Sequence, residues 1–146
     1  MVFITIISFV LFSIVVSIEP VPPERDPTPY EATFDGLGSG TGVVDSFYPN
    51  VVQFFGIPYS YPPVNERRFR VPKLMDSWSE KLNLEQYKPL CHQGNNEEEE
   101  KDWEPGVSED CLYLNIFAPK EAIENPNGNY PVQVYFHGGG YQRGTG

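Results

Sequence analysis

The segment that constrains the fold most is residues 111–119, "CLYLNIFAP", in which aliphatic side chains occupy every second position. Leu112, Leu114 and Ile116 would share one face of a β-strand, because successive side chains of a strand point to opposite faces of its sheet. This period of two predicts a strand with one face well buried.

Further strands are expected on both sides of this segment. A second alternating stretch, residues 132–136, follows the turn-rich "ENPNGN", and a β-rich stretch at 51–55 is ended by Gly56 and the prolines after it. The glycines at 36, 38, 40 and 42 match no phosphate-binding motif. They are expected to form a turn that leads into a short strand at 42–47. Only residues 119–124 suit a helix, so four or five strands joined by long irregular loops are predicted.

The first 17 residues have the character of a secretory signal peptide. An apolar run at residues 2–16 is too short for a membrane span, which needs about 20 apolar residues, but suits a signal sequence. Ser17, with Val15 two positions before it, predicts cleavage after residue 17 and a secreted chain with no stable membrane span. No basic residue precedes the run, and an uncleaved anchor is the alternative.

Residues 18–41 read as an N-terminal arm rich in proline and glycine. Five prolines between residues 19 and 29 favour extended, solvated backbone that joins neither a helix nor a strand ladder. The formal charge of −10 argues against a nucleic-acid partner, since phosphates select basic surfaces.

The chain has two cysteines, Cys91 and Cys111, and an even count in a secreted chain predicts one disulfide. Closing this loop stabilises the fold by about 3 kcal/mol in the chain-entropy estimate. A metal site at Cys91 and His92 is not predicted, because the sequence has no second pair of ligands at a suitable spacing. The glutamates at 97–100 are read as a solvated run rather than a calcium site. Neither metal nor cofactor is predicted.

Five segments, in this order, resemble the N-terminal quarter of the type B carboxylesterases and cholinesterases: "FFGIPYSYPPVNERRFRVP", Trp78, "CHQ", "SEDCLYLNIFAP" and "PVQVYFHGGGYQRG". The resemblance covers residues 42–146, and "EDCLYLNIFAP" is its most specific part. It implies the α/β class: the N-terminal, mostly β part of an α/β-hydrolase fold, incomplete as a domain. The missing parallel strands and covering helices would leave apolar faces and a sheet edge exposed.

The resemblance also implies a role for the glycines after residue 136. Gly139 and Gly140 would donate their backbone N–H groups to the oxyanion that forms when a small carboxylic ester is attacked. Gly138 would let the chain turn after the strand, and His137 would brace the loop rather than transfer protons.

Three further predictions come from the same resemblance. Cys91 and Cys111 match the family's first disulfide, and Arg68 and Glu109 match a buried ion pair that costs about 3 to 5 kcal/mol to break from one side. Trp103 lies eight residues before Cys111, near the position of the choline-stacking tryptophan of cholinesterases. A packed loop tryptophan is the alternative for Trp103.

The catalytic triad of the family has no counterpart in these residues. The nucleophilic serine should stand in GxSxG, with the acid and the histidine following it; no serine after residue 17 has this context, and no histidine follows His137. The prediction is the N-terminal portion of a secreted carboxylic ester hydrolase, inactive as this chain. Two alternatives are a non-catalytic, cholinesterase-like adhesion protein of the neuroligin type that binds a protein partner, and a short, independently folded secreted module.

Overall fold

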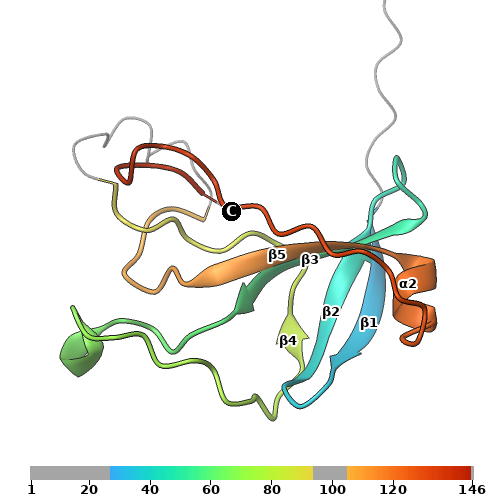
Figure 1. The fold of residues 1–146 in the computed structure, drawn as a ribbon, viewed down its shortest axis with the longest axis horizontal. Coiled ribbons are helices and arrows are strands. Elements are labelled where there is room, and N and C mark those ends of the chain that lie inside the picture. The colour runs from blue at the N-terminus through green and yellow to red at the C-terminus, as the bar shows by residue number, and fades with distance from the viewer. Residues whose placement is uncertain (1–26, 94–104, 146) are drawn as a thin grey trace, which may run out of the picture.

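A computed structural model describes residues 27–93 and 105–145, which form one five-stranded sheet (Figure 1). The strand order is β1-β2-β3-β5, and β4 pairs with β2 off this path. The strands are β1 (Thr28–Phe34), β2 (Gly38–Val44), β3 (Val51–Pro58), β4 (Leu82–Asn83) and β5 (Tyr113–Pro119). The pairings along the path are antiparallel, and β4 runs parallel to β2.

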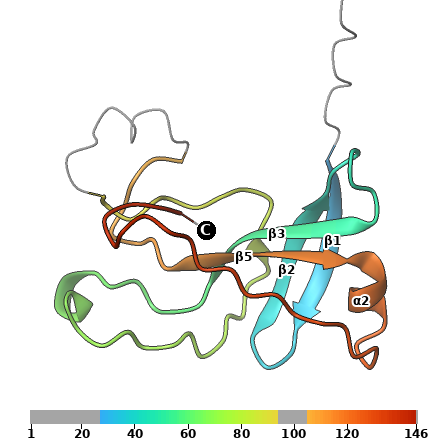
Figure 2. The ribbon, with the colours of Figure 1, turned by 45° about the horizontal axis from the view of Figure 1, so that its top comes forward.

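Helical structure is sparse in the described residues, as the sequence predicts. It consists of a 3-10 turn, η1 (Asn65–Arg67), and one α-helix, α2 (Lys120–Glu124), which confirms the helix expected at 119–124. In this part of the chain no helix has the length and apolar character needed to cross a membrane. After α2 the chain turns back and runs without regular structure toward the opposite end of the sheet (Figure 2).

The strand β1 was not predicted, because it lies in the segment assigned to the N-terminal arm. Thr28 and Pro29 already pair with Val44 and Val43, and a tight turn closes the hairpin, in which the Leu37 N–H donates to the Phe34 carbonyl at 3.0 Å. β1 is an edge strand, where a proline is tolerated because one side of the strand has no neighbour to receive its missing N–H.

Strand β2 occupies Gly38–Val44 and not the expected 42–47, and two of its glycines lie at close contacts. A Cβ on Gly40 would lie 2.5 Å from Leu84 Cδ1, and a Cβ on Gly42 would lie 2.5 Å from both the Gln53 carbonyl and the Phe54 ring. Glycine in a strand marks such close approaches. These glycines therefore serve packing, in agreement with the rejection of a phosphate loop.

A small core lies where β2, β3 and β4 meet. Its buried members are Val44, Val52, Phe54, Ile57 and Leu84. Partly buried residues packed on them are Tyr30, Ala32, Phe34, Trp78, Leu82 and Ile123. Burial of such side chains is the main favourable contribution to folding.

Strand β3 continues beyond Phe55, where the sequence predicted its end. Gly56, at φ 69°, forms an irregularity in the ladder between Phe54 and Ile57. Its N–H donates to the Asn115 side-chain oxygen at 2.9 Å. A β-bulge thus replaces the expected stop, because a strand can absorb one positive-φ glycine and resume pairing.

Strand β5 is confirmed, but the burial predicted for its aliphatic face is wrong. Leu114 and Ile116 are 38% and 37% exposed, and Phe117 on the other face is 59% exposed. The described residues supply one sheet and one short α-helix, which is too little structure to cover both faces of β5.

The strand predicted at 132–136 is not formed: these described residues have no regular structure. Its apolar residues alternate as a strand would require, yet none of them pairs with a described neighbour, and Val132 and Phe136 are each 86% exposed. Alternation favours a strand only where another strand is available for pairing. The exposed apolar side chains agree with those expected for a sheet that lacks part of its covering.

Candidate functional site

The candidate site is the glycine loop, defined here as residues 137–145. It turns at Gly139, whose carbonyl accepts the N–H groups of Gln142 and Arg143 at 3.1 and 3.3 Å. Gly140 and Tyr141 follow at φ 61° and 59°, values that are easy for glycine but costly for a tyrosine. The loop is therefore a tight left-handed turn.

The three consecutive glycines have different structural roles. Gly139 has a φ of 125°, and a Cβ there would overlap the Arg143 carbonyl oxygen. A Cβ at Gly140 or Gly138 would meet nothing within 4 Å. Gly138 is not among the positive-φ glycines, and the role expected for it, in letting the chain turn, stays a prediction.

The N–H groups of Gly139 and Gly140 donate no hydrogen bond to any described residue. Both residues are exposed. Two adjacent donors on a glycine turn form a suitable receptor for an oxygen that carries negative charge. Both amides are therefore open to an acceptor from outside the described residues.

His137 contacts the loop at two points. Its Nδ1 lies 2.7 Å from the Gly138 carbonyl oxygen, a contact that is a hydrogen bond in the tautomer protonated at Nδ1. A Cβ on Gly144 would overlap the same Nδ1, so Gly144 lies directly against the imidazole. The imidazole thus lies against the backbone of the loop, and the bracing role expected for His137 stays a prediction.

Gln93 joins the far end of the loop to the rest of the chain. Its Oε1 accepts the Gly144 N–H at 2.9 Å, and its Nε2 donates to the Gly144 carbonyl at 2.5 Å. Sequence reasoning assigned Gln93 no role, although it stands in the "CHQ" motif that contributed to the resemblance.

The disulfide predicted between Cys91 and Cys111 is confirmed, with the two Cα atoms 5.0 Å apart. Next to it, the Leu90 N–H donates to the Gly106 carbonyl at 2.9 Å, and the Leu90 carbonyl accepts the Ser108 N–H at 2.8 Å. The backbone before Gln93 is therefore held both covalently and by hydrogen bonds.

Arg68 and Glu109 form the predicted contact, with the Arg68 Nε bonded to the Glu109 carboxylate. The burial implied for this pair is not found, since the side chains are 54% and 40% exposed. The reason is that Arg68 lies just after η1 on the surface, where the neighbouring Phe69 is 93% exposed. Trp103, the glutamates at 97–100 and the signal peptide at 1–17 lie outside the described residues.

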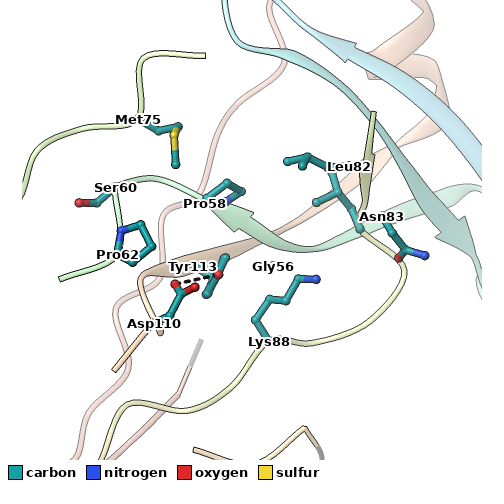
Figure 3. Close-up of a pocket in the computed structure, with 11 residues that line it drawn as sticks. Gly56, Pro58, Ser60, Pro62, Met75, Leu82, Asn83, Lys88, Asp110 and Tyr113 are labelled. Carbon is teal, nitrogen blue, oxygen red and sulfur yellow. Dashed lines mark hydrogen bonds between the residues drawn. The ribbon is translucent and has the colours of Figure 1, made fainter. Parts of the chain in front are cut away.

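A second feature, which the sequence did not predict, is a pocket of about 300 Å³ beside β3, β4 and β5 (Figure 3). Its lining includes Tyr113, whose hydroxyl donates to Asp110 Oδ1 at 2.8 Å. Burial, and then this hydrogen bond, raise the pKa of Tyr113 to about 12. Ser60 in the wall is 2% exposed and donates to the Lys73 carbonyl at 2.9 Å, so it is not placed to act as a nucleophile.

Metal binding has no support in the part of the chain that is described. No group of three histidine, cysteine, aspartate or glutamate side chains there lies close enough to hold an ion.

The sheet, the disulfide and the glycine loop point to an esterase-like protein, and comparison with known proteins identifies the family. A model of the carboxylesterase family matches residues 35–146, and the chain belongs to this family. The match begins inside residues 18–41, the segment expected to precede the domain.

Relatives of this chain include an esterase and a neuroligin. Fumonisin B1 esterase of Sphingopyxis macrogoltabida is 37% identical over 106 residues, covering 73% of this chain and 19% of that protein. Neuroligin-2 of Rattus norvegicus is 34% identical over 128 residues, covering 66% of this chain and 15% of its own length. The chain thus spans less than a fifth of the length of these two relatives.

A solved structure of a PNB esterase is similar to this fold, with a TM-score of 0.63 and 35% sequence identity over 80% of this chain and 23% of that one. The predicted fold class is thereby confirmed: the sheet corresponds to the mostly β, N-terminal portion of an α/β-hydrolase esterase.

Proposed function

We propose that this chain supplies the oxyanion-hole loop of a secreted carboxylic ester hydrolase, with the N–H groups of Gly139 and Gly140 as donors. Attack on an ester carbonyl moves negative charge onto its oxygen, and preorganised donors stabilise that charge more in the transition state than in the ground state. The observation that carries the proposal is the turn itself: two adjacent amides on glycine backbone, uncommitted to any described residue. Removing one such donor typically costs about 3 kcal/mol, or two to three decades in rate.

As this chain, the protein is expected not to turn over esters, because it contains no serine in the GxSxG context. An oxyanion loop without nucleophile and base gives at most a residual rate enhancement. The test is to incubate the purified 146-residue protein with p-nitrophenyl butyrate and follow release of nitrophenolate. Turnover above buffer that a serine-directed phosphonate abolishes would contradict this expectation.

The role of the glycine loop is tested in a longer product of the same gene. Cloning of the transcript beyond codon 146 should find GxSxG followed by an acid and a histidine. In that product, Gly140→Ala should lower kcat by two to three decades by crowding the ester and disturbing the donor. Gly36→Ala is the matched control, since Gly36 also has positive φ, 71°, and also has no atom within 4 Å of a Cβ. Equal activity of the two variants would overturn the assignment.

The neuroligin-type alternative, with a protein partner in place of an ester, is decided by the same cloning. A continuation that lacks the serine, acid and histidine would select the binding protein. The amides of Gly139 and Gly140, which donate to no described residue, favour the esterase, because a surface-binding protein has no need to keep two adjacent donors uncommitted. Trp103 stays a candidate substrate-binding residue of the enzyme, and secretion through a signal peptide at 1–17 stays part of the proposal.

A further inference from the structure

We infer that Gln93 is a positioning residue of the glycine loop, acting through a clamp on Gly144 that fixes His137 and the backbone at Gly138. The meaning of this clamp for ester hydrolysis rests on the proposed function. The clamp itself is a statement about the geometry of the chain and can be tested separately.

The clamp engages both polar backbone groups of Gly144. The Gln93 side-chain amide accepts from the Gly144 N–H at 2.9 Å and donates to its carbonyl at 2.5 Å. One hydrogen bond would let residue 144 rotate about a single contact, whereas two bonds on opposite backbone groups fix its position and its orientation. Glutamine is suited to this task because its planar amide carries a donor and an acceptor side by side.

Gly144 transmits this constraint to the glycines. Its φ of 138° is open to glycine, and a Cβ there would overlap Nδ1 of His137. The imidazole therefore lies against Gly144 and is held on its other contact by the Gly138 carbonyl, 2.7 Å from Nδ1. The contacts run from Gln93 through Gly144 and His137 to Gly138, which directly precedes the proposed donors.

The clamp needs a rigid support, and the disulfide region provides one. Gln93 follows Cys91 by two residues, Cys91 is bonded to Cys111, and Tyr113 at the start of β5 follows Cys111 by two residues. Residues 132–136, which lead into the loop, join no strand in the described structure. Residues 132–136 enter the loop at His137, and Gln93 holds it near its other end, at Gly144. Gln93 thus attaches that end to the disulfide region.

The experiment compares Gln93→Met, Gln93→Glu and the control Gln86→Met in the isotopically labelled full chain by NMR. Methionine matches the length of glutamine without its hydrogen bonds, and Gln86 is an exposed glutamine outside the loop. Gln93→Met should speed hydrogen exchange of the Gly144 amide about tenfold and shift the amide resonances of Gly138, Gly139 and Gly140. Gln93→Glu, which keeps an acceptor for the Gly144 N–H, should restore part of the protection.

The amide of Leu84, which donates to the Thr41 carbonyl at 2.8 Å, reports on general unfolding and should not change. Unchanged Gly144 exchange and unchanged glycine resonances in Gln93→Met would overturn the inference, as would equal acceleration at Leu84 and Gly144. If the clamp responds as expected while the longer gene product hydrolyses no ester, the proposed function fails and the clamp stands.

Discussion

Replacing Gly42 by alanine should destabilise the sheet by about 2 kcal/mol, although it adds a single methyl group. The new Cβ would lie 2.5 Å from the backbone oxygen of Gln53 and 2.5 Å from Cδ1 of Phe54. Ordinary carbon contacts need about 3.5 Å or more, so either the strand or the ring has to move. Phe54 is 2% exposed and the oxygen belongs to β3, which leaves neither group room to yield.

The magnitude follows from two opposing terms. Overpacking a core of this kind costs up to about 3 kcal/mol. Replacing glycine by alanine recovers about 0.5 to 1 kcal/mol, since the unfolded chain loses conformational freedom. The difference is the expected loss of about 2 kcal/mol. Gly138→Ala is the matched control, because Gly138 lies outside the positive-φ set and has no atom within 4 Å of a Cβ.

Urea unfolding of the three proteins, followed by tryptophan fluorescence, measures both effects. Gly42→Ala should lower the midpoint at unchanged m-value, and Gly138→Ala, which adds no close contact, should raise it slightly or leave it within the error of the wild type. If the two variants unfold at the same urea concentration, the packing argument for the glycines of β2 is refuted.

Three further predictions concern the loop, the pocket and the disulfide. Gly139→Ala should abolish the turn, with the amide resonances after it displaced, while Gly140→Ala should keep the turn at a cost of about 1 to 2 kcal/mol to the local conformation; proton NMR distinguishes them. The folded-state pKa of Tyr113 is raised from 10.0 to about 12, so its contribution to stability is fully present below pH 10 and is lost as the pH rises toward 12. Urea titrations at alkaline pH should show this loss in the wild type and not in Tyr113→Phe. Reducing the bond between Cys91 and Cys111 should lower the free energy of unfolding by about 3 kcal/mol, as measured in urea with and without a phosphine reductant.

Each of these expectations has a clear contrary result. Retention of the wild-type turn resonances in Gly139→Ala would show that the overlap with Arg143 is avoidable. An identical alkaline slope in Tyr113→Phe would assign the loss of stability to other groups. An unchanged midpoint after complete reduction would mean that the loop between the cysteines is closed equally well by the hydrogen bonds of Leu90.

Local patterns predicted β5, the helix after it and the disulfide correctly. The alternation in residues 111–119 depends only on neighbouring residues, and the cysteine count depends only on composition. Both can therefore be read from the sequence without knowing the fold. The same kind of pattern failed at residues 132–136, because a strand also needs a partner, and no described segment lies beside these residues to pair with them. Leu114 and Ile116 failed for a related reason: alternation defines a face but does not show what covers it.

The residues of the candidate site also differ in whether the sequence could predict them. Gly139 and Gly140 could be singled out from the motif alone, since three consecutive glycines after a histidine are a local pattern. Gln93 could not be, because its hydrogen bonds to Gly144 join residues 51 positions apart.

By itself, the sequence determined membership of the carboxylesterase family, the positions of the turn-forming glycines and the pairing of the two cysteines. These properties reside in residue identity and short spacing. Only the tertiary structure decided that β1 joins the sheet, that the glycines of β2 admit Leu84 and Phe54, and that Gln93 holds the glycine loop. The physical reason is that close packing and paired hydrogen bonds depend on which distant segments meet, and that outcome belongs to the whole folded chain.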